Sequence, residues 1–212
     1  MELLDPVEVR VLGSLIEKEA TTPEYYPLTL NALVNACNQK SNREPVVSYD
    51  DDTVEDALEG LRAKRFVLIV TGSGRVTKYG QRISETFNLG RRELALLAVL
   101  LLRGPQTLGE LKDRCERMYS FADLEETERV LDKLAEWPSG ALAVKLARQP
   151  GQKESRYAHL LSGELSPADL HTESAAPQAV PRVQQLEDSL RQLRAEFDEL
   201  KQRFDTLESQ LK

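Results

Sequence analysis

Apolar residues recur at helical spacing in three successive segments between residues 7 and 61. The first segment follows Asp5-Pro6-Val7-Glu8, which supplies a cap, a first-turn proline and the glutamate of a capping box. The second follows Thr29 and the third follows the aspartates at 50–52. Two β-rich runs come next, residues 66–70 and 75–79, joined by Thr-Gly-Ser-Gly, which predicts a hairpin. Three helices and a hairpin are the elements of a winged-helix domain.

The same order of elements recurs in the next part of the chain. Helices are predicted from about residue 92 to 103, after the capping box that begins at Thr107, and after Asp123. Strands are predicted at residues 141–148 and 155–161, around a turn that contains Pro150-Gly151. The sequence therefore predicts an α+β, mainly helical protein with two tandem winged-helix domains, residues 1–88 and 89–161.

The C-terminal part of the chain has a different pattern. Residues 162–181 are rich in Pro, Ser, Ala and Glu and predict a linker. Residues 182–212 place an apolar residue at every third or fourth position, a period of 3.5 that predicts a coiled-coil helix and a homo-oligomer. The alternative is a helix that folds back onto its own globular part. The predicted oligomerisation positions are Val183, Leu186, Leu190, Leu193, Phe197, Leu200, Phe204, Leu207 and Leu211.

Composition narrows the class of protein. The chain has 212 residues and a formal net charge of −7, so a generally basic nucleic-acid binder is disfavoured. Its longest apolar run, residues 94–102, is far shorter than the ~20 residues of a membrane span. The N-terminus lacks the pattern of a signal peptide. Two cysteines on apolar helix faces fit a reducing compartment, so we expect a cytoplasmic protein without membrane contact.

Three stretches of the chain are distinctive: KEATTPEYYPL at residues 18–28, LNALVNACNQKSNREPV at 30–46 and RQPGQKESRYAHLL at 148–161. They resemble the YceH family of bacterial proteins. The resemblance covers about residues 3–161 and leaves out the linker and the coiled-coil segment. It implies tandem winged-helix domains in a cytoplasmic bacterial protein, and it implies no particular activity.

Little in the sequence indicates catalysis. The two histidines, His159 and His171, have no cysteine or carboxylate neighbours at metal-ligand spacing. The glycines at 72 and 74 join two strands and do not open a helix, as a phosphate-binding loop would. We therefore expect no catalytic residues, no metal and no cofactor.

Charge points to DNA contact through the hairpins. In winged-helix folds the third helix often enters the major groove, but here both third helices begin with acids, at 50–52 and 123–126, that would repel phosphates. Bases gather in the hairpins and in the loop after the second helix, where point charges suffice for backbone contact. The predicted function is a non-catalytic, DNA-associated regulator. Its candidate nucleic-acid-binding residues are Arg62, Lys64, Arg65, Arg75, Lys78, Arg82, Lys40, Arg43, Lys145, Arg148, Lys153 and Arg156.

Each part of this hypothesis has an alternative. The hairpin bases can be ordinary strand residues that pair with the acidic third helices. The amides between Asn35 and Asn42 either read base edges or cap the second helix and stabilise the loop toward Pro45. The rival function is a protein-interaction scaffold that uses the acidic third helices and the coiled coil to bind a protein partner. Duplex DNA as a partner requires that the hairpin bases form one coherent positive surface.

Overall fold

Two short antiparallel sheets and seven α-helices make up the part of the chain that the computed structural model describes, residues 2–70, 76–148 and 152–163. The expected α+β class is confirmed. The predicted linker and coiled-coil positions, together with Arg75, lie outside the described residues. No helix among the described residues is long and apolar enough to cross a membrane.

The first set of elements, here called the first repeat, contains three helices, three strands and a short 3₁₀ turn, η1. In chain order they are α1 (Pro6–Thr21), η1 (Pro23–Tyr25), β1 (Leu28–Thr29), α2 (Leu30–Cys37), α3 (Asp51–Ala63), β2 (Val67–Val70) and β3 (Lys78–Gln81). The strands form an antiparallel sheet in the order β1-β3-β2.

The second repeat has the same succession of helices and strands. Its elements are α5 (Arg91–Arg103), β4 (Gln106–Thr107), α6 (Leu108–Cys115), α7 (Leu124–Ala135), β5 (Ala143–Lys145) and β6 (Arg156–His159), and α4 (Ile83–Phe87) joins the two repeats. Its sheet order, β4-β6-β5, matches that of the first repeat. Neither α4 nor the two-residue strands β1 and β4 are predicted from the sequence. Strands as short as β1 and β4 are defined by their pairing and not by their own residues.

The predicted helix caps form as expected. The Asp5 carboxylate accepts hydrogen bonds from the Val7 and Glu8 amides, and Glu8 accepts from the Asp5 amide. Thr107 and Glu110 make the same reciprocal pair at the start of α6. These caps satisfy amides that have no partner within the helix, and each contributes about 1 kcal/mol.

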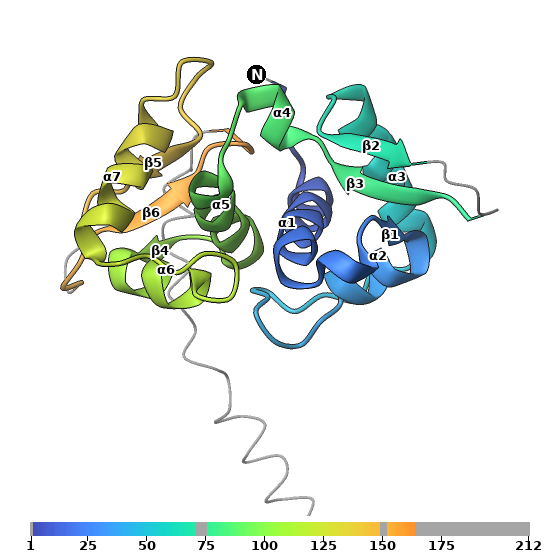
Figure 1. Ribbon diagram of the computed structural model, residues 1–212, viewed down its shortest axis with the longest axis horizontal. Coiled ribbons are helices and arrows are strands. Elements are labelled where there is room, and N and C mark those ends of the chain that lie inside the picture. The colour runs from blue at the N-terminus through green and yellow to red at the C-terminus, as the bar shows by residue number, and fades with distance from the viewer. Residues whose placement is uncertain (1, 71–75, 149–151, 164–212) are drawn as a thin grey trace, which may run out of the picture. The chain divides into compact units, whose positions relative to one another are not determined.

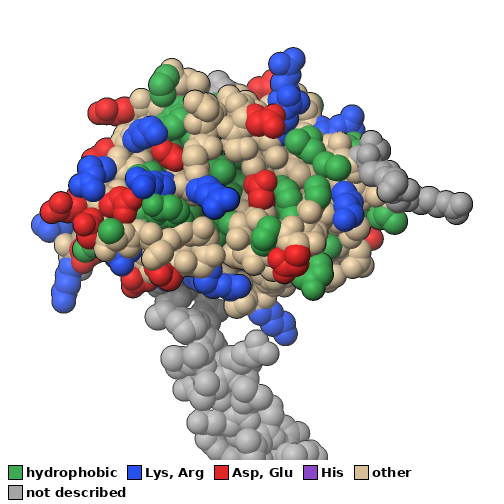
Figure 2. All heavy atoms as spheres, in the orientation of Figure 1, with side chains coloured by type: hydrophobic (Ala, Val, Ile, Leu, Met, Phe, Trp, Pro, Cys, Tyr) green, Lys and Arg blue, Asp and Glu red, His purple; other side chains and the backbone are tan. Residues whose placement is uncertain are grey.

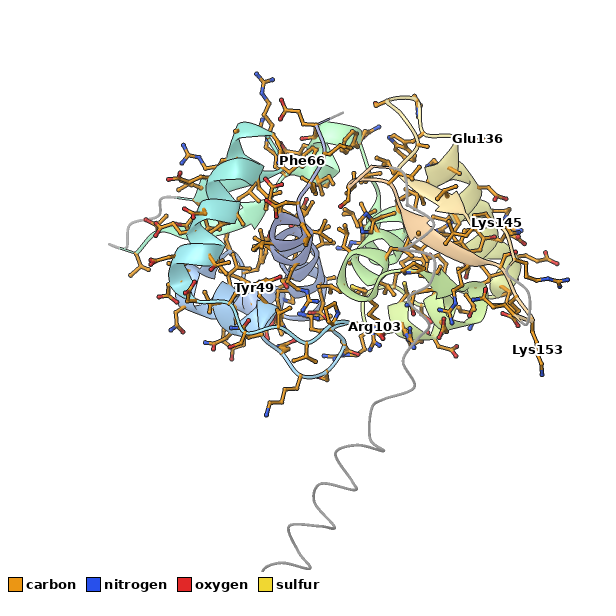
Figure 3. The ribbon with its side chains drawn as sticks, turned by 180° about the vertical axis from the view of Figure 1, so that it is seen from behind. Tyr49, Phe66, Arg103, Glu136, Lys145 and Lys153 are labelled. Carbon is orange, nitrogen blue, oxygen red and sulfur yellow. The ribbon has the colours of Figure 1, made fainter. Side chains whose placement is uncertain are left out.

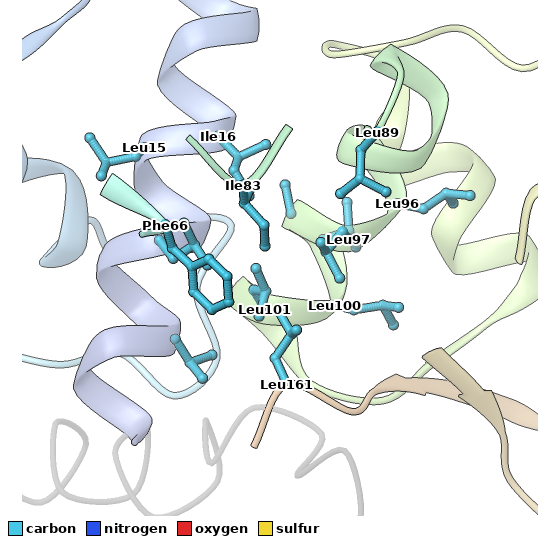
Figure 4. Packing of buried hydrophobic residues seen from close by; sticks show 14 of the residues in the cluster. Leu15, Ile16, Phe66, Ile83, Leu89, Leu96, Leu97, Leu100, Leu101 and Leu161 are labelled. Carbon is cyan, nitrogen blue, oxygen red and sulfur yellow. The ribbon is translucent and has the colours of Figure 1, made fainter. Parts of the chain in front are cut away.

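The core is centred on α1 and α5, which pack side by side with the two sheets on opposite sides of the pair (Figure 1). Residues 8–17 of α1 are all buried, as are nearly all residues of α5 between 93 and 102. Figure 4 shows Ile16, Leu97 and Leu101 among the buried side chains of this region. A Cβ atom added at Gly13 would lie 3.0 Å from the Cβ of Leu101, so glycine is what permits this close approach of the two helices.

Contacts group the described residues into one compact unit. The predicted boundary between residues 88 and 89 falls inside this unit, between α4 and α5. Because the first helices of the two repeats bury their faces against each other, the repeats share a single hydrophobic core.

Candidate interaction surface

The outer face of α3 is a row of carboxylates. Val54, Ala57, Leu58 and Leu61 form its buried stripe, and this 3–4 spacing places the acids on the opposite side. Asp50 caps the helix, and hydrogen bonds from Thr53 lower the pKa of its carboxyl group. The exposed acids are Asp51, Asp52, Glu55, Asp56 and Glu59; below they are called the α3 acidic face.

The α3 acidic face is not neutralised by the protein's own bases. No ion pair between described residues involves any of its five acids. In the second repeat, by contrast, the acids of α7 pair with bases: Glu125 with Arg129, Glu126 with Arg92, and Glu128 with Lys145. The two third helices are both acidic in sequence, but described bases pair with three acids of α7 and with none of the α3 acidic face.

An apolar side chain lies beside the α3 acidic face. Ile69 of β2 is 38% exposed and stands directly opposite Tyr79 of β3 in the ladder. Directly opposed residues project from the same side of a sheet. Tyr79 is buried, and α3 packs against β2, the strand that pairs with β3. Ile69 therefore projects from the sheet face next to α3 and supplies an apolar neighbour for the carboxylates.

The bases predicted in the first hairpin are divided among different surroundings. The Lys64 ammonium pairs with the buried Glu8 carboxylate at 2.5 Å, so it is tied to the N-terminal end of α1. Arg82 pairs with Glu85 at 3.1 Å on the surface of α4. Arg62, Arg65 and Lys78 are exposed, and they are the described bases of this hairpin region that could meet a ligand.

The second hairpin uses two of its four predicted bases internally. Lys145 donates to Glu128 at 2.8 Å, and Arg156 contacts Glu110 at 3.2 Å and the Pro105 carbonyl at 2.9 Å. These pairings agree with the alternative that hairpin bases neutralise neighbouring acids. Arg148 and Lys153 are exposed, and Figure 3 shows Lys145 and Lys153 on the side of the molecule formed by the second repeat.

The predicted bases that the structure describes are divided between the two repeats. The strands of the two hairpins lie on opposite sides of the α1–α5 pair (Figure 1). Acidic and basic side chains are interspersed over the face shown in Figure 2, with no gathering of bases across it. A single straight duplex therefore meets no continuous basic stripe on that face.

The loop after α2, residues 38–50, is fastened to the core. Lys40 is exposed, but Arg43 is buried, with a guanidinium that bonds the Glu17 carboxylate at 2.6 Å and the Ala36 carbonyl. Arg43 is thus placed where phosphate contact is impossible without unfolding this loop. The Asn38 side chain bonds the backbone of Tyr49 in both directions at 2.8 Å. This arrangement supports the structural alternative for the amides.

The same loop joins the two repeats. The Arg103 guanidinium of α5 donates to the Asn42 side chain, and the Glu44 amide donates to the Leu102 carbonyl at 2.8 Å. On the first-repeat side, Arg10 of α1 donates to the Pro45 carbonyl at 2.6 Å. The loop is therefore a clamp between α1 and the C-terminal end of α5.

Comparison with known proteins identifies one matching family and several similar proteins. The family model described as "Protein of unknown function, DUF480" matches residues 4–152. A UPF0502 protein of Solibacter usitatus is 54% identical over 202 residues, which cover 95% of this chain and 95% of the relative. UPF0502 proteins of Geobacter sulfurreducens and Vibrio cholerae are 54% and 52% identical over 190 and 176 residues, covering 89% and 81% of this chain and 85% and 82% of the relatives.

The chain belongs to the DUF480 family. The family match covers the first repeat and the second repeat up to residue 152, so the clamp and the α3 acidic face lie within the part that this DUF480 protein has in common with the family. Sequence reasoning missed Arg10, Glu17 and Arg103 as members of the clamp. No local signal marks them, because each is far along the chain from the groups that it bonds.

Reactive side chains in the described part of this DUF480 protein are shielded. Burial raises the pKa of the Cys37 thiol, and it raises the pKa of Cys115 to about 12, so both thiols are protonated at neutral pH and are weak nucleophiles. Burial lowers the pKa of His159 to about 4. Among the described residues no group of three His, Cys, Asp or Glu side chains is arranged to hold a metal ion.

Proposed function

We propose that this DUF480 protein is a non-catalytic protein-interaction scaffold built from two winged-helix domains, with the α3 acidic face as its docking surface. The order of elements and the shared sheet order support the winged-helix assignment. The observation that carries the function is the lack of described ion pairs on the α3 acidic face. Five such carboxylates repel one another, and a cationic partner relieves that repulsion.

The partner that fits this surface is a basic protein segment with at least one apolar side chain. Its lysines or arginines would lie along α3 between Asp52 and Glu59, and the apolar side chain would cover Ile69. Charge complementarity then governs the association rate and the choice of partner, while the apolar contact supplies a disproportionate share of the affinity.

Duplex DNA stays a second prediction, and the geometry supports it less. A recognition helix that carries five carboxylates repels phosphates. The exposed bases are divided between two hairpin regions that face away from each other. Contact through the first hairpin alone would use Arg62, Arg65 and Lys78, and three phosphate contacts give an affinity that falls steeply with salt.

Two further features complete the proposal. We propose that residues 182–212 form a coiled coil that joins copies of the chain, so that each assembly presents several α3 acidic faces and gains avidity. We also propose that the protein is cytoplasmic and that the YceH resemblance describes this same family.

A capture experiment tests the docking surface. The full chain, immobilised, is exposed to an extract of a bacterium that carries the protein, and retained proteins are quantified by mass spectrometry. The variant Glu55→Lys with Glu59→Lys reverses charge on α3 at helical spacing i, i+4. The matched control, Asp132→Lys with Glu136→Lys, makes the same change at the same spacing in the second repeat.

The proposal predicts a retained protein that wild type and the control capture equally and that the α3 variant loses at least tenfold. Ile69→Ala should weaken the same capture without altering the charge. Equal capture by the α3 variant would contradict the proposal, provided that circular dichroism shows all variants folded.

A further inference from the structure

A small cavity of about 40 Å³ lies where the C-terminal end of α1 meets α5 and the end of α6. Its wall includes three guanidinium-bearing residues, Arg103, Arg114 and Arg117. All three arginines belong to the second repeat, and they line one cavity although the formal net charge of the protein is −7. Burial lowers the pKa of Arg103 and that of Lys18, and the positive charges of Arg114 and Arg117, respectively, lower them further.

Nearby acids leave a positive excess at this cavity. Glu17 lines it, but its carboxylate is neutralised by Arg43 at 2.6 Å. Glu110 contacts Arg114 at 3.4 Å and also bonds Arg156. No ion pair between described residues involves Arg117. The C-terminal ends of α1, α5 and α6 add roughly half a negative charge each, which three guanidinium groups outweigh.

We propose that this cavity binds the oxyanion of a small phosphate ester. The space accommodates roughly three water molecules, at about 10–15 Å³ each, which is close to the room that the oxygens of one tetrahedral oxyanion need. Arginine suits this chemistry because its planar group donates two parallel hydrogen bonds to phosphate oxygens. Arg114 and Arg117 supply such donors, and the exposed position of Arg117 lets its side chain close over the anion.

A neighbouring hollow indicates what the ester group is attached to. Met118 lines both the anion cavity and a hollow of about 440 Å³ between α1, α4 and α5. That volume lies within the range of small-molecule sites. Its wall combines an apolar side, with Ile16 and Leu94, and a polar side made by Glu19, Gln81, Ser84 and Arg91. An apolar or aromatic body would fill this hollow while its phosphate occupies the cavity, and the flexible Met118 adapts between them.

Thermal unfolding of the full chain tests the site, with inorganic phosphate and phenyl phosphate as probes and sodium chloride at equal ionic strength as the reference. A ligand that binds only the folded state raises Tm by about 5 °C at 100 times its Kd. The test variants are Arg117→Ala and the double variant Arg114→Ala with Arg117→Ala. The matched control is Arg129→Ala, which removes an exposed arginine of α7.

We expect phosphate to raise Tm in wild type and in the control, phenyl phosphate to raise it further, and both shifts to vanish in the double variant. If that variant does not fold, Arg117→Ala alone should at least halve the shifts. Undiminished shifts in the folded variants, or no shift in wild type beyond that of chloride, would overturn the site. Equal shifts with the two probes would contradict the role of the hollow. Neither result depends on the α3 acidic face.

Discussion

The Arg43 guanidinium depends on a countercharge from a residue that is distant in the sequence. Its side chain is fully buried, and Glu17, on another element, supplies its countercharge at 2.6 Å. A buried charge is tolerable only when it is paired and hydrogen-bonded. The pair therefore holds the clamp loop against α1 and, through Asn42 and Arg103, against α5.

Removal of the countercharge tests this role. Glu17→Gln leaves the buried guanidinium without an anion, and we expect the free energy of unfolding to fall by about 3–5 kcal/mol. Urea denaturation monitored by circular dichroism measures the loss. As a control, Glu125→Gln breaks the exposed pair with Arg129 and should cost less than about 1 kcal/mol. Similar losses in the two variants would mean that the clamp pair has no special role.

The half-buried His159 of β6 makes stability depend on pH. Its pKa of about 4 in the folded protein lies below the ordinary value of 6.5, so between these pH values the unfolded chain binds the proton more readily. Stability therefore falls as pH decreases from about 6.5 to 4, by roughly 3 kcal/mol from this residue. His159→Gln removes that contribution. The stability of the variant relative to wild type should therefore be higher at pH 5 than at pH 7. A pH-independent difference in urea denaturation would contradict the assignment.

At the scale of elements, the contact between α1 and α5 joins the repeats. The helices approach so closely at Gly13 that a Cβ atom would lie 3.0 Å from side-chain atoms of Leu101 and Leu102. A protein interior that is packed this densely has little room for additional atoms. The contact therefore makes the two repeats one cooperative unit.

Two glycine substitutions separate packing from helix propensity. Gly13→Val forces a branched side chain against Leu101 and Leu102, and we expect a loss of about 1–3 kcal/mol. Gly109→Ala in α6 meets open space, so it should be neutral or stabilise by up to about 1 kcal/mol. Differential scanning calorimetry measures both. Equal Tm values for Gly13→Val and wild type would show that the helices are not closely packed at this point.

The helices could be predicted from the sequence because their signals are local. Asp5, Thr107 and Asp123 cap helices through amides two or three residues away, and the apolar stripes repeat within each segment. The second strand of the first hairpin was predicted at residues 75–79, whereas β3 spans Lys78–Gln81. Its register is set by pairing with Val67 and Leu68, and that partner cannot be known from the strand's own residues.

At the scale of the whole molecule, the sequence predicted the site in part. The sequence itself shows that the acids of α3 would repel DNA phosphates. They are Asp51, Asp52, Glu55, Asp56 and Glu59. Which bases would neutralise acids was not predictable. Lys64 pairs with Glu8, and Lys145 pairs with Glu128, across separations that only the packing of elements reveals. Arg43 was assigned to DNA for the same reason, since its polar neighbours in sequence conceal a buried environment.

The association of several copies of the chain is also a property of the whole molecule. If residues 182–212 join copies of the chain, truncation at Pro181 should reduce the mass measured by light scattering to that of a single chain, while the full chain gives a multiple of 23.9 kDa. A full chain that is monomeric at tens of micromolar would contradict the predicted coiled coil and favour a helix folded onto its own globular part.

We propose that the α3 acidic face, and not the basic hairpins, is the interaction surface. The most direct measurement compares two charge-reversed full-length chains in one capture experiment with quantitative mass spectrometry. One carries Glu55→Lys and Glu59→Lys, and the other carries Arg65→Glu and Lys78→Glu. We predict that the first loses its protein partner at least tenfold, that the second retains it, and that neither binds duplex DNA at 50 mM salt. The proposal would be contradicted if the hairpin variant, and not the α3 variant, lost the protein partner. It would also be contradicted if duplex DNA bound the α3 variant and not the hairpin variant.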